Sequence, residues 1–332
     1  MPYSKVTGLG YYLPETIVTN ADLAAQMDTS DEWIVERTGI RERRFFKEGV
    51  DTVSNMGARA ARIAMDRAGR KPEDIDMVVF ATLSPDYYFP GCGVLAQREL
   101  GLRQIPCFDI RQQCGGFVYA LSLADQYIRT GFAKKVLVIG SEIQSNVMEI
   151  SDRGRNMAAI FGDGAGALLL EAHDEAGKGL LSTHLHSDGT HAEELMVEHI
   201  GSKRKQRITH AMIDDGSMLP YMNGKMVFQH AVRYFPEVIR EALTANNLKE
   251  SDIDIFVPHQ ANARITQAVQ KELGLRDDQV VSNIHKYGNT TAGSIPIALT
   301  EAWEEGRVKE GDLVCLAAFG SGFMWASTLI RW

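Results

Sequence analysis

The chain has 332 residues, of which 45% are hydrophobic and 23% charged, a composition typical of a globular protein with a sizeable core. Its formal net charge of −8 excludes an overall basic surface of the kind that binds nucleic acid. No charged N-terminal segment precedes an apolar one, no apolar run has membrane-spanning length, and the four cysteines show no CxxC spacing, so we expect a cytoplasmic protein without a membrane span.

Apolar runs of strand length alternate with helix-length segments along the chain. The runs that we interpret as buried strands are residues 77–82, 136–140, 167–170, 253–257 and 313–317. Buried strands separated by helices are typical of α/β proteins. The predicted fold class is therefore α/β.

A weak internal repeat indicates two similar halves. Residues 60–79 resemble residues 238–257, and residues 131–141 resemble residues 306–321. In each half a helix, a strand, a helix and a strand follow in the same order, which predicts a duplicated α/β unit with the functional site between the halves. We place the halves at residues 1–171 and 172–332, and we expect the polar, basic stretch between residues 195 and 226 to cross the surface.

Two basic runs, residues 37–44 and 203–207, stand out against the acidic composition. Either run could bind a phosphate group or an acidic protein. A solvated charged face is the more common role of such a run.

Cys114 lies between an expected strand at 107–110 and an expected helix at 117–125. Taken alone, a free cysteine is more often a small buried hydrophobic residue than a nucleophile. At a helix N-terminus, however, free backbone N–H groups and the helix dipole stabilise the nucleophilic thiolate, by about 0.3–1 kcal/mol. Gly115 and Gly116 leave the sulfur open to a substrate. We therefore interpret Cys114 as a candidate nucleophile.

Two candidate hydrogen-bond donors occupy the corresponding part of the second half. His259 follows the expected strand 253–257, and Asn289 lies in a Gly-Asn-Thr-Thr turn. Both side chains can offer an N–H group to the same point in space, although each residue type is ordinary at such a position.

A series of motifs runs through nearly the whole chain: DEWIVERTGIRER from residue 31, CGGFVYAL from 114, FGDGAGA from 161, HLHSDG from 184, PHQAN from 258, GNT from 288 and FGSGFMW from 319. In order and spacing this series resembles the β-ketoacyl-acyl-carrier-protein synthase III family of the thiolase superfamily. The resemblance implies a thiolase fold, which is a five-layer αβαβα sandwich of two fused halves, and usually a homodimer. It also implies a Cys114-His259-Asn289 catalytic triad.

The implied activity is the decarboxylative condensation of an acyl-CoA primer with malonyl-acyl carrier protein, through an acyl-cysteine, at the start of fatty acid biosynthesis. No cofactor is implied beyond the CoA thioester substrate.

The resemblance also assigns roles to single positions. The backbone N–H groups of Cys114 and Ser321 would form the oxyanion hole. The CoA site would contain Trp33 and Arg153 around the adenine, Arg37 at a phosphate, and Asn262. The carrier protein would dock at Gln260, Arg264 and Lys271, and the acyl pocket would contain Gln144, Phe161, Leu195 and Phe89 of the partner subunit. Without the resemblance, the same residues are an ordinary core and surface.

Several positions depart from the family pattern. Gln112-Gln-Cys-Gly replaces the more usual Ala-Ala-Cys-Ala, Gln144 replaces an apolar pocket residue, and Ser321 replaces a glycine. Lys225 and Gln229 also differ from the residues common at their positions. The altered pocket predicts a primer longer than acetyl, such as a medium acyl chain.

Two alternative functions stay open on the sequence. A specialised acyltransferase of polyketide or quinolone assembly would keep the same triad but use another acceptor, and a non-catalytic or hydrolytic protein would simply bury Cys114. The glycines at 162–166 precede an apolar strand instead of following one, which argues against a dinucleotide-binding loop. His184, His186 and His191 are too loosely spaced to predict a metal site.

Overall fold

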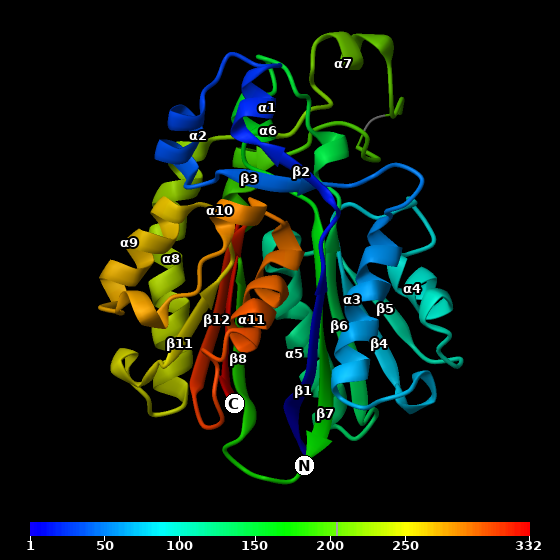
Figure 1. The fold of residues 1–332 in the computed structure, drawn as a ribbon, viewed down its shortest axis with the longest axis vertical. Coiled ribbons are helices and arrows are strands. Elements are labelled where there is room, and N and C mark those ends of the chain that lie inside the picture. Colours follow the sequence, from blue (N-terminus) through cyan, green and yellow to red (C-terminus); the bar gives the residue numbers. More distant parts are fainter. Residues whose placement is uncertain (204) are drawn as a thin grey trace.

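The structure is a computed structural model that describes residues 1–203 and 205–332. Arg204, part of the basic run 203–207, lies outside the described residues. Within the described residues, the first large sheet has the strand order β1-β7-β6-β4-β5, and the second has the order β11-β12-β13-β8 (Figure 1). The first sheet contains β1 (Tyr3–Tyr12), β4 (Met77–Ala81), β5 (Cys107–Ile110), β6 (Lys135–Glu142) and β7 (Gly164–His173). The second contains β8 (Gly179–Ser187), β11 (Ile255–Pro258), β12 (Leu313–Gly320) and β13 (Met324–Arg331).

Helices fill the space between the sheets and cover both outer faces. The helices α5 (Gly116–Arg129) and α11 (Ser294–Glu304) lie between the sheets, where side chains from both sheets form one hydrophobic cluster with them. A second cluster joins the first sheet to α3 (Val53–Arg67) and α4 (Cys92–Leu100). A third joins the second sheet to α8 (Gly224–Ala245) and α9 (Ala263–Leu273). The molecule therefore has the five layers, αβαβα, that the sequence predicts.

The chain passes from the first sheet to the second between His173, which ends β7, and Gly179, which begins β8. The boundary predicted at residues 171 and 172 thus falls within the last residues of β7. In the first sheet β4 pairs in parallel with β5 and β6, and in the second β11 pairs in parallel with β12. The carboxyl ends of these parallel strands lead into the loops that carry the candidate site.

Smaller elements gather at one end of the molecule (Figure 1). They are β2 (Thr16–Thr19), α1 (Asn20–Ala24), α2 (Asp31–Thr38), β3 (Glu42–Phe45), α6 (Arg155–Ala158), α7 (His210–Asp214) and α10 (Ile284–Tyr287). The stretch expected to cross the surface carries α7, which protrudes in Figure 1, and two short paired strands, β9 (Leu195–Met196) and β10 (Tyr221–Met222).

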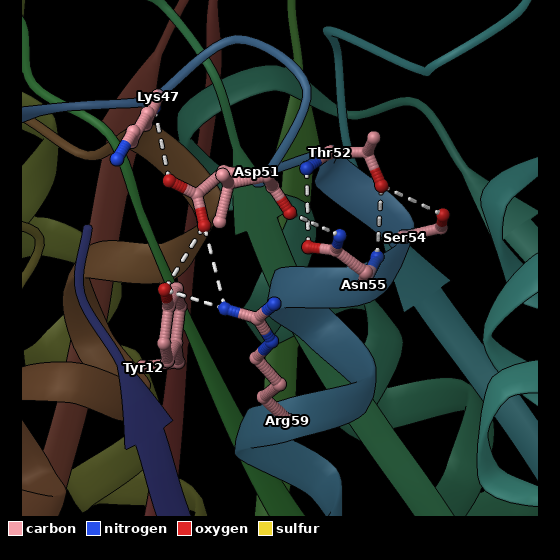
Figure 2. A network of polar contacts seen from close by, with 8 residues as sticks. Tyr12, Lys47, Asp51, Thr52, Ser54, Asn55 and Arg59 are labelled. Atoms are coloured by element: carbon pink, nitrogen blue, oxygen red, sulfur yellow. Dashed lines mark hydrogen bonds and ion pairs between the residues drawn. The ribbon is translucent and has the colours of Figure 1, made fainter.

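A polar network fixes the loop that enters α3 (Figure 2). Asp51, whose residue is 4% exposed, accepts hydrogen bonds from the Tyr12 hydroxyl and from the backbone N–H of Lys47, each at 2.9 Å. Arg59 of α3 donates to the Tyr12 hydroxyl at 2.6 Å, and Thr52 caps the helix. The first sheet and α3 are thereby held together at the end where the loops of the site begin.

Within the described part of the chain, every helix is too short or too polar to cross a membrane.

Candidate active site

Cys114 lies in a 3₁₀ turn, Gln113–Gly115, immediately before α5. Gln113 has a φ of 41°, in the left-handed region, so the turn is sharp. A Cβ atom added at Gly320, at the end of β12, would lie 2.7 Å from the Cβ of Cys114 and 3.3 Å from its sulfur. The absence of a side chain at Gly320 therefore keeps room for the thiol.

Burial raises the pKa of the Cys114 thiol to about 12, and the negative charge of Glu142 acts in the same direction. The backbone N–H groups of Ser321 and of Cys114 itself stabilise the thiolate and oppose this rise in the pKa. Cys114 is thus a neutral thiol at neutral pH in this structure. The thiolate expected from the helix N-terminus is outweighed by burial.

His259 follows β11 and is held by both its backbone and its ring. Its backbone N–H donates to the carbonyl of Ala317 at 2.8 Å, and its Nδ1 lies 2.6 Å from the hydroxyl of Ser294. Its Nε2 has no hydrogen-bond partner among residues 1–203 and 205–332. Burial lowers the pKa of His259 to about 3, so the ring is neutral at physiological pH.

Asn289 is fixed by backbone bonds on both sides. Its N–H donates to Ile160 at 2.9 Å, and its carbonyl accepts from Gly162 at 3.1 Å. The side-chain Oδ1 accepts from the backbone N–H of Thr291 at 2.9 Å, which orients the amide. The two N–H groups of Nδ2 are therefore left to act as donors toward a ligand.

A cavity of about 560 Å³ brings these side chains together. Eight of the predicted residues line it, namely Arg37, Cys114, Phe161, Leu195, His259, Asn262, Arg264 and Asn289. The apolar remainder of the wall, which includes Met222, Val227, Phe228, Phe235 and Phe319, was not predicted from the sequence. The cavity has the size of a small-molecule site and contains a thiol together with two N–H donors.

Comparisons with known proteins show the family of the chain. Family models described as 3-oxoacyl-[acyl-carrier-protein (ACP)] synthase III and its C-terminal part match residues 108–189 and 243–332. A β-ketoacyl-[acyl-carrier-protein] synthase III of Paramagnetospirillum magneticum is 46% identical over 99% of this chain and 98% of its own length. The chain belongs to the β-ketoacyl-acyl-carrier-protein synthase III family.

Solved structures place the family's fold on nearly the whole chain. The 3-oxoacyl-[acyl-carrier-protein] synthase III of Aquifex aeolicus has a TM-score of 0.90 and 40% identity, with 99% of this chain and 100% of that chain covered. The priming β-ketosynthase of the R1128 polyketide pathway has a TM-score of 0.88 and 34% identity, with 99% and 96% covered. The predicted thiolase fold and acyltransferase class are confirmed.

The synthase III resemblance implies that Trp33 and Arg153 lie on either side of a bound adenine, and in this structure two other cations lie over the Trp33 ring. The guanidinium of Arg37 lies 4.5 Å from the centre of the Trp33 ring, and that of Arg155 lies 5.7 Å from it. Arg153 pairs with Glu149 and donates to the carbonyl of Asp214 at 3.0 Å. The contact between Arg155 and Trp33 was not predicted from the sequence.

Two of the residues assigned from the synthase III family are buried and hydrogen-bonded within the protein. Gln260 is 1% exposed, and its side chain donates to the carbonyl of Pro258 at 2.8 Å and accepts from the N–H of Asn283 at 3.1 Å. It therefore stabilises the turn after β11 and offers no docking surface. Gln144 is absent from the described lining of the cavity, because its Nε2 donates to Glu142 at 3.2 Å and its backbone N–H to Asp163 at 2.7 Å.

Other assigned residues lie near the cavity or at the surface. Asn262 caps α9 and donates from its Nδ2 to the carbonyl of Arg37 at 2.9 Å. Lys271 is an exposed residue of α9. Phe89 is 81% exposed and stays outside the described cavity wall of this chain.

Two contacts of the synthase III site escaped the sequence analysis. The hydroxyl of Ser321 donates to the carbonyl of Leu195 at 2.5 Å and so joins the end of β12 to β9. The buried carboxyl of Glu142 accepts from the hydroxyls of Ser84, at 2.6 Å, and Thr82, at 3.1 Å, and burial raises its pKa. An acidic residue two positions after the apolar run 136–140 was the signal for Glu142.

The histidines set aside as metal ligands have other partners. Glu241 accepts from His184 at 3.0 Å and from His186 at 2.6 Å. The ring of His191 lies 4.5 Å from that of His230, centre to centre. Among the described residues, no group of three or more histidine, cysteine or acidic side chains is arranged to hold a metal ion.

Proposed function

We propose that this chain condenses an acyl-CoA primer with malonyl-acyl carrier protein through an acyl-cysteine on Cys114. The observation that carries the proposal is that one cavity holds the Cys114 thiol together with two outwardly free donors, one from His259 and one from Asn289. A thiol can carry an acyl group, and two N–H donors can stabilise a negative oxygen beside it. Because Cys114 precedes position 171 and the two donors follow it, both predicted halves, 1–171 and 172–332, would contribute to the site.

In the first half-reaction the Cys114 sulfur attacks the thioester carbonyl. The carbon–sulfur bond to CoA breaks, and the thiol proton ends on the departing CoA sulfur, so the enzyme retains only the acyl group. The backbone N–H groups of Cys114 and Ser321, which already act on the sulfur, would hold the oxyanion. Each such donor typically contributes roughly 3–4 kcal/mol to transition-state stabilisation.

In the second half-reaction the malonyl group loses CO₂ and leaves an enolate on the carrier thioester. The Nε2 of neutral His259 and the Nδ2 of Asn289 would donate hydrogen bonds to the enolate oxygen. The enolate carbon then attacks the acyl-cysteine carbonyl, and the Cys114 thiolate leaves. The product is a 3-oxoacyl chain on the carrier protein.

Basic groups at the cavity support binding of CoA and an acidic carrier protein. Arg37 and Arg264 line the cavity. The guanidinium groups of Arg37 and Arg155 lie over the ring of Trp33. These side chains fit a nucleotide with phosphate groups. Arg264 and Lys271, both exposed on α9, would attract the carrier protein by charge.

The open edge of the first sheet supports a homodimer. Its edge strand, β5, leaves Phe108 42% exposed, and the nearby loop exposes Tyr87, Tyr88 and Phe89 by 60%, 68% and 81%. Asp86 fixes this loop to the first turn of α3 by accepting from the N–H groups of Val53, at 2.6 Å, and Ser54, at 3.1 Å. We infer that Phe89 enters the acyl pocket of the partner subunit.

The apolar wall of the cavity supports a primer longer than acetyl. Phe161, Leu195, Phe228 and Phe235 leave more apolar surface than two carbons can cover. The four cysteines are free thiols, which fits the reducing cytoplasm where acyl-CoA is found.

Intact mass spectrometry tests the proposal. The protein and its Cys114→Ala variant are exposed to acyl-CoAs from acetyl to dodecanoyl, first alone and then with malonyl-acyl carrier protein. We expect one acyl adduct that requires Cys114, best with a medium chain, and its conversion to 3-oxoacyl carrier protein. Absence of both adduct and released free acid at every chain length would refute the proposal, and a preference for acetyl-CoA would refute the longer primer.

A second candidate is priming of polyketide assembly, favoured by the similarity to the R1128 priming ketosynthase. The two functions share the acyl-cysteine and differ in the acceptor. Product analysis with a fatty-acid carrier protein and with a polyketide carrier protein distinguishes them, because only the cognate carrier should be extended at an appreciable rate.

A further inference from the structure

Ser294, the first residue of α11, lies directly behind the imidazole of His259. Its hydroxyl oxygen is 2.6 Å from His259 Nδ1, and the residue is 2% exposed. It is separated from His259 by 35 positions in the chain. Because water is excluded from this contact, the hydrogen bond must be arranged entirely within the protein.

The donors around this hydroxyl decide where the imidazole proton sits. The backbone N–H of Gln260 donates to the Ser294 oxygen at 3.3 Å. If His259 Nδ1 also carried a proton, it too would donate to that oxygen, and the Ser294 O–H would find no acceptor among the contacts of the described residues. If Nδ1 is bare, the Ser294 O–H donates to it, and both groups are satisfied.

The second arrangement leaves the proton on Nε2. Nε2 is buried and has no hydrogen-bond partner among the described residues. His259 itself lines the cavity. An N–H group in that position is available to a substrate oxygen. We propose that Ser294 is a positioning residue that holds His259 in its Nε2–H tautomer.

This inference rests on the proposed function and adds the reason why His259 presents an N–H group at Nε2. A neutral imidazole protonated at Nε2 cannot accept the Cys114 proton through that nitrogen. His259 therefore serves the malonyl half-reaction as a donor and does not serve Cys114 as a base. Loss of the Ser294 hydroxyl should impair decarboxylation and condensation while acyl loading of Cys114 continues.

Nitrogen NMR of the full-length protein tests the tautomer directly. Histidine is labelled with ¹⁵N in both ring nitrogens, and the His259 signals are identified by their absence from His259→Ala. We expect a bare Nδ1 and a protonated Nε2 in the unmodified protein, and a shift toward mixed tautomers in Ser294→Ala. A protonated Nδ1 in the unmodified protein would overturn the inference, whatever the variants do.

Kinetics of the two half-reactions provide the second readout. In Ser294→Ala, acyl loading followed by intact mass should stay within about threefold of the unmodified protein, whereas loss of CO₂ from malonyl-acyl carrier protein should slow by about tenfold or more. The matched control is Thr300→Val, which removes another buried hydroxyl of α11, one that donates to Pro296 at 2.6 Å without contacting His259. Equal loss in both half-reactions, or equal loss in the control, would assign Ser294 a purely structural role.

The NMR and kinetic results also separate this inference from the proposed function. If the unmodified protein forms no acyl-Cys114 and releases no CO₂, the function fails, and the tautomer measurement still decides the role of Ser294.

Discussion

At the scale of single residues, the site is built from groups that are neutral and incompletely satisfied. Burial keeps the Cys114 thiol and the His259 ring uncharged. The side-chain oxygen of Asn289 accepts a hydrogen bond from the backbone, and its side-chain nitrogen stays available as a donor. Unsatisfied donors cost stability when no ligand is bound. Such groups persist where a substrate oxygen takes the place of the missing partner.

The neutral state of His259 predicts a flat pH dependence for the second half-reaction. The pKa of His259 is lowered from the ordinary 6.5 to about 3, so the neutral ring predominates at every pH above that value. We expect the loss of CO₂ by pre-acylated enzyme, measured in single turnovers between pH 7.5 and 5.5, to show no inflection near 6.5. A tenfold fall per pH unit in this interval would mean that His259 titrates as an ordinary histidine.

At the scale of elements, one hydrogen bond connects the end of β12 to the wall of the cavity. Ser321, after β12, donates to Leu195 of β9, and β9 pairs with β10, whose Met222 also lines the cavity. A glycine at position 321 would keep the backbone N–H group but lose this connection. The departure from the family pattern at Ser321 thus adds a hydrogen bond to a residue of the cavity wall and leaves the backbone N–H group at position 321 in place.

Removal of that connection should change primer choice. In Ser321→Ala we expect loading of acetyl-CoA to change little and loading of longer acyl-CoAs to change severalfold relative to it, because Leu195 loses its anchor. The free energy of unfolding should fall by about 1 kcal/mol, measured by denaturant titration. The control is Ser217→Ala, which removes a partly buried hydroxyl from the stretch between residues 195 and 226. Identical chain-length profiles in the two variants would contradict this account.

A strand could be predicted from the sequence where a continuous apolar run marks it. The five runs interpreted as strands correspond to β4, β6, β7, β11 and β12. β1, β8 and β13 were not predicted, because glycines, serines and histidines interrupt their apolar pattern and pairing with neighbouring strands determines them. Pairing with neighbouring strands is not contained in any short stretch of sequence, so these three antiparallel strands appear only in the structure.

At the scale of the whole molecule, the first sheet ends in an exposed edge strand beside an aromatic loop. Exposed strand edges favour pairing with another strand. The exposed aromatic side chains of the nearby loop, Tyr87, Tyr88 and Phe89, add apolar surface that a partner could cover. The cavity wall of one chain lacks Phe89, so a partner subunit would complete it.

Disruption of this edge should therefore change both assembly and activity. Phe108→Arg on β5 should shift sedimentation from dimer toward monomer and reduce acyl loading by about tenfold, since one buried aromatic can contribute about 2 kcal/mol or more to an interface. Ile213→Arg on α7, which replaces another exposed apolar side chain at 52% exposure, should leave both measurements unchanged. A monomeric unmodified protein would refute the homodimer.

The sequence by itself determined the α/β class, and it predicted two similar halves and singled out Cys114, His259 and Asn289 as candidates, because these depend on local patterns and on motifs of adjacent residues. Only the tertiary structure decided which groups contact them. Ser294 contacts His259 across 35 positions, Ser321 contacts Leu195 across 126, and the side chains of Gln260 and Gln144 form hydrogen bonds within the protein. The physical reason is that protonation, tautomer and pocket shape depend on burial and on partners brought together by layer packing, which the linear order of residues does not specify.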